Sequence, residues 1–176
     1  MKIGITGTPG TGKSSVAENL SDFLDWKVIK INEILTKNDI YEGYDEKRGS
    51  YIVDQDRLDE VLEAFMTENC IVEGHLAHYV SDLDYIFVLR AKPKELKKRL
   101  KSKGWNKDKI VENVQAEILD TILQKSTERH SNVCEINTTK KSAFKVAKII
   151  QKVVEGEEEP ENFKPGQVDW TGYLSY

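Results

Sequence analysis

Eight residues near the start of the chain have the types and the spacing of a phosphate-binding loop. Residues 7–14 read Gly-Thr-Pro-Gly-Thr-Gly-Lys-Ser, in which four residues separate two glycines and lysine and serine follow at once. Glycines let backbone N–H groups point at a phosphate, and the start of a following helix adds its positive dipole end. We expect Lys13 to reach the β- and γ-phosphates of a nucleotide and the Ser14 hydroxyl to ligate Mg²⁺. The other expected nucleotide contacts in this loop are Gly10, Thr11, Gly12 and Ser15.

A carboxylate and an imidazole at the end of a later apolar run could complete this chemistry. Glu73 and His75 are two residues apart, so they share one face of a strand and point toward the loop. A carboxylate there typically holds Mg²⁺, and a histidine, which titrates near neutrality, could orient a water or an acceptor phosphate. We therefore predict Lys13, Glu73 and His75 as catalytic residues and Ser14 and Glu73 as metal ligands. The alternative is a surface acid beside a turn histidine, and no role is assigned to the other histidines, His78 and His130.

Apolar patterns around these motifs predict the elements that must position them. Strand patterns lie at residues 2–6, 27–31, 70–74, 85–89 and 133–137, and helical patterns lie at 15–24, from 55, and at 93–104, 107–126 and 141–154. Strands that alternate with helices form a parallel sheet through right-handed crossovers, and such sheets bind ligands at the carboxyl ends of their strands. The sequence therefore predicts a three-layer α/β fold, with a five-stranded parallel sheet and helices on both faces.

Composition and charge narrow the class of protein. A length of 176 residues suits one domain, and a net charge of −4 argues against general nucleic-acid binding. Between positions 90 and 109 there are ten Lys or Arg residues against two acidic ones, so this stretch is either a solvated helix face or a surface that faces phosphate. No apolar run is long enough for a bilayer, and we expect a cytoplasmic protein without membrane contact. For Cys70 and Cys134, both in apolar runs, we expect buried free thiols rather than a disulfide or metal ligands.

Two segments should depart from the regular alternation. Residues 32–53 carry turn residues and tyrosines, which predicts a helical or irregular insertion outside the core. Residues 155–162 hold five acidic residues with Gly and Pro, and we expect a flexible link. Residues 163–176 contain four aromatic side chains, which pack either on the protein's own surface or on a partner.

Several motifs along the chain resemble one family. They are the phosphate loop at 7–13, Tyr-Glu-Gly-Tyr-Asp-Glu at 41–46, Asp-Gln-Asp-Arg at 54–57, Glu-Gly-His at 73–75, and Lys-Gly-Trp-Asn at 103–106, which leads to Glu-Asn-Val-Gln-Ala-Glu at 112–117. Together they resemble the adenylate kinase isoenzyme six family, also called the coilin-interacting nuclear ATPase family, which has archaeal members. The resemblance covers nearly all of residues 1–154, and the motif at 112–117 is far more specific than the phosphate loop.

The resemblance implies the P-loop nucleoside monophosphate kinase fold and an atypical kinase that converts ATP and AMP into two ADP. It also implies ATPase activity and a role in assembling the small ribosomal subunit through a ribosomal protein. Residues 1–154 would form the kinase domain, with a monophosphate-binding insertion at 31–53 and a short lid at 102–112, and residues 155–176 an acidic linker and aromatic tail. Arg99 would lie by the adenine and Lys103 near the ATP phosphates. The monophosphate-binding residues would be Lys37, Asp54 and Arg57.

This chain departs from the family pattern at three positions. The family usually has aspartate in place of Glu73 and arginine in place of Lys37 and Lys103, and lysine lacks the two-pronged grip of arginine on phosphate. The lid is also short, and residues 111–124 contain no Lys or Arg that could balance the charge of the moving phosphoryl group. We therefore expect slow phosphotransfer with which water competes. The open alternatives are an ATP-hydrolysing assembly factor and a kinase for another small acceptor, such as shikimate or a different nucleotide.

Overall fold

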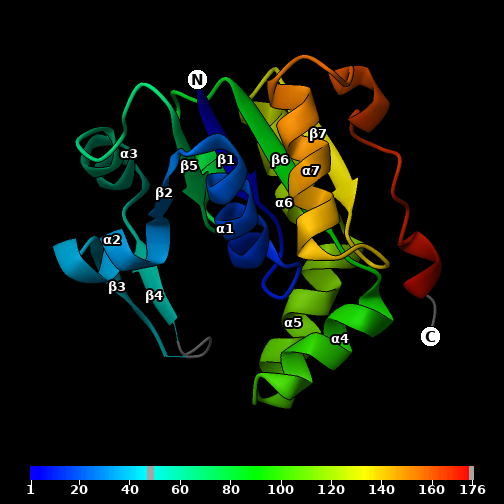
Figure 1. The fold of residues 1–176 in the computed structure, drawn as a ribbon. Helices are drawn as coiled ribbons and strands as arrows, with labels where there is room; N and C mark the ends of the chain where they lie inside the picture. Colours follow the sequence, from blue (N-terminus) through cyan, green and yellow to red (C-terminus); the bar gives the residue numbers. More distant parts are fainter. Residues whose placement is uncertain (47–49, 175–176) are drawn as a thin grey trace.

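A five-stranded parallel sheet forms the centre of the protein (Figure 1). The structure, a computed structural model, describes residues 1–46 and 50–174. The strand order is β2-β5-β1-β6-β7, so β1 is central and all carboxyl ends meet at one edge. No helix in the described residues is long and apolar enough to cross a membrane. The strands are β1 (Lys2–Thr6), β2 (Lys27–Lys30), β5 (Cys70–Glu73), β6 (Tyr85–Arg90) and β7 (Val133–Asn137), which confirms the five predicted strands.

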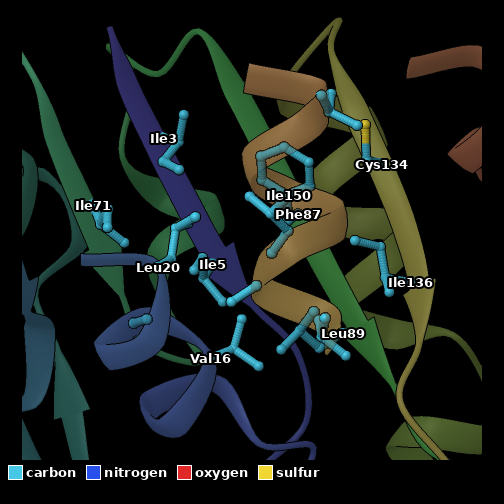
Figure 2. Close-up of a cluster of buried hydrophobic side chains, with 14 residues drawn as sticks. Ile3, Ile5, Val16, Leu20, Ile71, Phe87, Leu89, Cys134, Ile136 and Ile150 are labelled. Atoms are coloured by element: carbon cyan, nitrogen blue, oxygen red, sulfur yellow. The ribbon is translucent and has the colours of Figure 1, made fainter. Parts of the chain in front are cut away.

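Helices cover both faces of the sheet, which confirms the predicted three-layer α/β fold. Helices α1 (Lys13–Leu24) and α7 (Ala143–Val154) pack on one face, around Phe87 and its neighbours (Figure 2). The opposite face contacts α3 (Gln55–Glu63) and α6 (Thr121–Arg129). Because successive strand residues point to opposite faces, the unbroken apolar runs of the central strands serve both layers.

Helices α4 (Pro93–Ser102) and α5 (Lys107–Ile118) pack together beyond the carboxyl ends of the strands (Figure 1). The sequence pattern predicts one long helix over residues 107–126, and this prediction is wrong. The chain leaves helical geometry at Asp120, where φ is 55°, and α6 starts at the next residue. The Arg90 guanidinium explains the break, because its Nη2 bonds both the Glu117 carbonyl, at 2.9 Å, and the Asp120 carboxylate.

The predicted insertion contains more regular structure than its sequence indicates. Helix α2 (Ile31–Asn38) is followed by β3 (Tyr41–Asp45) and β4 (Ser50–Val53), which pair antiparallel in a sheet of their own. The prediction of a helical or irregular segment is right for α2 and wrong for the hairpin, since its turn residues and the shift in pairing register after Tyr41 obscure the alternation. The expectation that this segment lies outside the core is wrong for α2, because Ile31, Ile34 and Leu35 are buried in a core cluster with α3 and β5. Residues 47–49 of this segment lie outside the described residues.

The tail beyond α7 runs along the protein's own surface. The acidic stretch ends in the 3₁₀ turn η2 (Pro160–Phe163), and Phe163 packs against the core cluster that α7 and β7 share. The main-chain N–H groups of residues 166–168 donate to the Glu135 carboxylate on β7, before the last turn η3 (Thr171–Tyr173). Self-docking, one of the two alternatives for the aromatic tail, is what the described residues adopt.

The two cysteines lie on opposite faces of the sheet. Cys70 on β5 and Cys134 on β7 are buried free thiols, as predicted. Cys134 belongs to the cluster under α1 and α7, and Cys70 to the cluster under α2 and α3. Burial raises the pKa of the Cys134 thiol to about 11, so it is protonated and unreactive at neutral pH.

Candidate active site

The loop between β1 and α1 uses glycine where its backbone turns sharply. Gly7, Gly10 and Gly12 have φ values of 137°, 93° and 100°. A Cβ atom at Gly7 would lie 2.4 Å from the Leu89 carbonyl oxygen, so a side chain does not fit there. Gly12 is the N-cap of α1, and the loop before it turns on a hydrogen bond from the Thr11 N–H to the Thr8 carbonyl, at 3.2 Å. This is a form that can surround an anion with backbone N–H groups.

The Lys13 ammonium is buried inside this loop. Its Nζ donates to the Thr8 carbonyl at 3.2 Å. Burial lowers the pKa of Lys13 to about 8, although Glu73 nearby favours the charged form. The amine therefore remains mostly charged at pH 7. A carbonyl is a weak partner for a buried ammonium, so we expect the side chain to turn toward a phosphate when one binds.

Ser14, Glu73 and His75 lie together at the carboxyl end of β5. The Ser14 hydroxyl donates to Glu73 Oε1 at 3.2 Å, and both residues line one cleft with His75. Burial, together with the charges of Lys13 and Lys109, lowers the pKa of His75 to about 4. The imidazole is therefore neutral at physiological pH and can accept a hydrogen bond from a water or a hydroxyl group.

The oxygen atoms of Ser14 and Glu73 suit a magnesium ion. Mg²⁺ prefers oxygen ligands and is usually bound by one or two protein oxygens together with waters and substrate phosphates. A hydroxyl and a carboxylate in contact, beside the buried Lys13 ammonium, provide this donor set at the mouth of the phosphate loop. Kinases of this P-loop type generally use Mg²⁺, and the residues present fit it.

Two cavities meet at the loop. One, of about 380 Å³, is lined by Arg99, whose Nη1 donates to the Gly10 carbonyl at 3.4 Å. The other, of about 600 Å³, is lined by Lys13, Glu73 and His75. Both are also lined by Gly10 and by Lys103, so the loop and this lysine separate them. A pocket of about 90 Å³ at the junction is lined by Gly10, Gly12, Lys13, Ser14, Ser15 and Lys103.

The predicted catalytic, metal and ATP-binding residues thus lie around the loop, whereas the predicted monophosphate-binding residues do not. Lys37 is exposed in the last turn of α2. Asp54 caps α3 by accepting from the Arg57 N–H at 3.0 Å. The Arg57 guanidinium donates to the carbonyls of residues 38 and 39, at 3.4 and 3.3 Å, and so holds the end of α2. Lys37, Asp54 and Arg57 are absent from the lining of both cavities.

The basic stretch predicted between residues 90 and 109 divides into three parts. Arg90 is buried in ion pairs with Glu117, Asp120 and Glu135. Arg99, Lys103 and Lys109 line the cavities. Lysines on the outer side of α4 are exposed, which is the solvated helix face. The solvated helix face is thus confirmed for the outer lysines of α4, and a surface that faces phosphate stays a prediction for the residues that line the cavities.

Among the cavity residues to which the sequence assigned no individual role, three carry groups that could contact a substrate. Lys109 and Lys125 line the 600 Å³ cavity, so cations flank the stretch 111–124 in which the sequence has none. Lys125 could not be predicted, because the break between α5 and α6 directs this part of the chain to the cleft. Thr138 lines the other cavity and donates from Oγ1 to the Thr11 carbonyl at 3.0 Å. It follows β7 at the carboxyl edge, the rule that identified Glu73, and the same signal could have found it.

Comparison with known proteins agrees with this geometry. A family model described as "AAA domain" matches residues 3–120. Proteins named "Putative adenylate kinase" are similar along nearly the whole chain. The protein from Methanosarcina barkeri is 43% identical over 97% of each chain. That from Archaeoglobus fulgidus is 40% identical over 99% of this chain and 94% of its own.

Solved structures of kinases share the fold at low sequence identity. A shikimate kinase from Acinetobacter baumannii superposes with a TM-score of 0.63 at 16% identity, covering 90% of this chain and 94% of its own. The YorR protein from Bacillus subtilis gives 0.61 at 18% identity, covering 89% and 97%. The first of these shares the P-loop kinase fold, and the relatives near 40% identity define the closer group. The chain therefore belongs to the family of those archaeal adenylate kinase homologues, and it is a phosphotransferase of the P-loop type.

Proposed function

We propose that this protein is a nucleoside monophosphate kinase that favours AMP and transfers the γ-phosphoryl group of ATP to it, giving two ADP. The observation that carries the proposal is the pair of cavities, about 380 and 600 Å³, that meet at the phosphate loop. A phosphoryl transfer needs a donor and an acceptor on opposite sides of the moving group. A protein that only hydrolyses ATP needs no second cavity of nucleotide size.

The donor occupies the smaller cavity in this proposal. Its base and ribose lie between Arg99 and Thr138, and its phosphates reach the loop amides, Lys13 and Lys103. Ser14 and Glu73 would hold Mg²⁺, which would supply positive charge beside the phosphates. The relatives named adenylate kinases and the resemblance to the isoenzyme six family support adenine as the base.

The acceptor occupies the larger cavity. Trp105 offers a ring to a base, and Lys109 lies over that ring with its Nζ 4.7 Å from the centroid. Lys109 and Lys125 place positive charge where an acceptor phosphate would enter. Neutral His75 accepts a hydrogen bond from an attacking hydroxyl or water. The predicted contacts from Lys37, Asp54 and Arg57 would require the α2 side to close on the acceptor.

A turnover assay tests this function. Purified protein with ATP and Mg²⁺ is supplied with AMP, GMP, CMP or UMP, and in a separate arm with shikimate, and the phosphorylated products are separated by ion exchange. We expect AMP to give ADP well beyond that formed from ATP alone. No increase with any monophosphate would contradict the kinase, and phosphorylated shikimate would replace it with another acceptor class.

We propose in addition that water competes with AMP, so that the protein is also an ATPase. Lys103 is exposed and the lid that carries it is short, so bound ATP stays open to solvent. Phosphate release in the absence of any acceptor, measured with and without Mg²⁺, tests this second reaction. We expect saturating AMP to suppress it by occupying the larger cavity.

A role in small ribosomal subunit assembly is the further part of the proposal that the family resemblance supports. Tyr173 and Leu174 in the docked tail are exposed to 43% and 52% and could contact a ribosomal protein. We expect such a complex to form in the cytoplasm, and its lifetime should differ between the ATP-bound and the ADP-bound protein. A complex with a lifetime that does not depend on nucleotide would contradict a role for hydrolysis in its release.

A further inference from the structure

Glu117 is a buried carboxylate that lies behind the phosphate loop and lines neither cavity. Its Oε2 accepts from the Thr8 hydroxyl at 2.6 Å. Its Oε1 accepts from Arg90 Nε at 2.9 Å, from the Ala91 N–H at 3.0 Å and from Trp170 Nε1 at 3.3 Å. These four donors, one of which belongs to the Arg90 guanidinium, satisfy both oxygens of a carboxylate that is only 2% exposed.

Thr8 is the residue through which this carboxylate can act on phosphate binding. The Thr8 carbonyl accepts from the Thr11 N–H at 3.2 Å, from Thr11 Oγ1 at 2.8 Å and from Lys13 Nζ at 3.2 Å. The main chain at Thr8 therefore sets both the curl of the loop and the place of the ammonium. A charge-assisted hydrogen bond from its side chain to Glu117 fixes that main chain from behind.

Arg90 connects Glu117 to the far side of the loop. It is buried at the end of β6, and its guanidinium also binds Glu135 and Asp120. Thr138 Oγ1 lies 3.0 Å from both the Arg90 carbonyl and the Thr11 carbonyl, so these two carbonyls share its one proton. Two threonine hydroxyls, one at each side, thus tie the loop to one buried charged cluster.

The C-terminal tail donates hydrogen bonds to two carboxylates of this charged cluster. Glu135 Oε2 accepts from the N–H groups of Gly166, Gln167 and Val168, at 2.9, 2.9 and 3.2 Å. The indole of Trp170 reaches Glu117 itself. Successive main-chain N–H groups around a carboxylate form a concave anion site, which leaves the other oxygen of Glu135 to Arg90.

We propose that Glu117 is a positioning residue for phosphate transfer, which holds Thr8 and through it Lys13, and that residues 166–170 of the tail keep Glu117 in place. This inference depends on the proposed function only in that the loop must bind ATP. Contacts from α5 and the tail hold the phosphate loop in its binding conformation before ATP arrives. Little conformational entropy is therefore lost when ATP binds.

The test compares Thr8→Val, which keeps the shape but removes the hydroxyl, with Thr8→Ser, which restores it. ATP and ADP affinities are measured by titration calorimetry without AMP, and ATP turnover and the melting temperature are measured in parallel. We expect Thr8→Val to lose about tenfold in ATP affinity, since one charge-assisted hydrogen bond is lost. The melting temperature of Thr8→Val should fall as well, because the buried Glu117 Oε2 loses its Thr8 donor. Thr8→Ser should recover most of the affinity. The matched control is Thr127→Val, whose hydroxyl donates within α6.

A double-mutant cycle assigns the effect to Glu117. Glu117→Gln alone should weaken ATP binding, with Glu128→Gln on the surface of α6 as control. The double variant Thr8→Val/Glu117→Gln should bind ATP about as well as the weaker single variant, because both remove the same link. Independent, multiplying losses would overturn the proposal. If Glu117→Gln does not fold, the Thr8→Val and Thr8→Ser variants still test the proposal. An ATP affinity that is unchanged in Thr8→Val would also overturn the proposal.

A variant in the tail is the last part of this test. Trp170→Phe keeps an aromatic ring but removes the indole N–H, and we expect a two- to threefold loss of ATP affinity; an unchanged affinity would remove the tail from the proposal. The outcomes also separate the two claims. If ATP binding depends on Thr8 but AMP does not stimulate phosphoryl transfer, only the proposed kinase function is contradicted. A parent protein that binds no ATP would overturn both.

Discussion

The two sides of the phosphate loop are built differently. On the side of α4, α5 and the tail, buried charges and hydroxyls hold the loop through Glu117, Arg90 and Thr138. On the side of α2 and the hairpin, large apolar side chains lie in solvent, with Tyr44 exposed to 54% and Ile52 to 47%. Figure 1 shows these two groups of elements on either side of the strand ends.

This difference teaches which substrate site is ready before binding. The back of the phosphate loop has little order left to gain, because the polar groups that hold it are already paired with one another. On the side of α2, two of the predicted monophosphate ligands, Asp54 and Arg57, are engaged at helix ends and must rearrange to reach the acceptor. We infer that ATP binds to a preformed site and that the acceptor completes its own site by closure of α2 and the hairpin.

The largest effect should come from the centre of the preformed side. Lys13→Met should reduce turnover by at least about 10³-fold, because the charge on the moving phosphoryl group loses its nearest cation. The same change should stabilise the fold. The lowered pKa of Lys13 means that the folded protein holds this proton less tightly than the unfolded chain does. The penalty is present in full below pH 8 and disappears as the pH rises toward 10.5, so the variant should gain about 3 kcal/mol at pH 7.

Chemical denaturation and a steady-state ATP assay check both parts of that prediction. Lys98→Met on the exposed face of α4 is the control, and it should change neither quantity. A Lys13→Met protein that retains turnover, or that is less stable than its parent, would contradict the preformed donor side.

His75→Ala should lower the ATPase rate by about 10²-fold with a smaller change in ATP affinity, because the imidazole acts on water or acceptor and not on ATP. Since burial lowers the pKa of His75 to about 4, the imidazole is already neutral throughout the range from pH 6 to 8. The rate should therefore show no inflection near pH 6.5. A rate profile with such an inflection that disappears in His75→Ala would contradict the buried, neutral imidazole. His130→Gln serves as the control histidine.

Arg57→Ala sharpens the comparison between the two sides. Loss of the guanidinium frees the end of α2, and we expect the KM for AMP to rise about fivefold while the KM for ATP stays unchanged. Initial rates at varied AMP and ATP separate these constants. An equal rise in both would mean that the two sides are not independent. Arg129→Ala, an arginine that lines neither cavity, is the matched control.

The smallest effect concerns acid stability. His78 is buried with both ring nitrogens unpaired among the described residues, and burial lowers its pKa to about 3, with Lys125, His75, Arg129 and His130 adding to the effect. The unfolded chain takes up a proton as the pH falls through 6.5 and the folded protein does not. At pH 5 this histidine therefore costs about 2 kcal/mol of stability relative to pH 8. His78→Phe should lose less stability between pH 8 and pH 5 than the parent, measured by urea unfolding. An equal loss would contradict the burial.

Local patterns predicted the sheet and the place of the phosphate loop and Glu73 at its carboxyl edge, because the information lies in neighbouring residues. The glycine spacing of residues 7–14 and the position of Glu73 after β5 are both short-range features. The break at Asp120 depends on Arg90, thirty residues earlier in the chain, and the Thr8–Glu117 bond spans 109 residues. Such contacts exist only once the fold has formed. The β3–β4 hairpin was also not predicted, because its shift in pairing register leaves no regular alternation of polar and apolar residues in the sequence.

Each of the two apolar layers contains one sulfhydryl group, Cys70 in one and Cys134 in the other. A reagent such as a disulfide dye reaches either sulfur atom only when its own layer opens, so the labelling rate of each reports the local opening free energy. Single-cysteine versions of the protein would therefore follow the loosening of the two halves separately during a catalytic cycle. Cys70 monitors the half next to the acceptor, and no fluorophore or spin label has to be added beforehand.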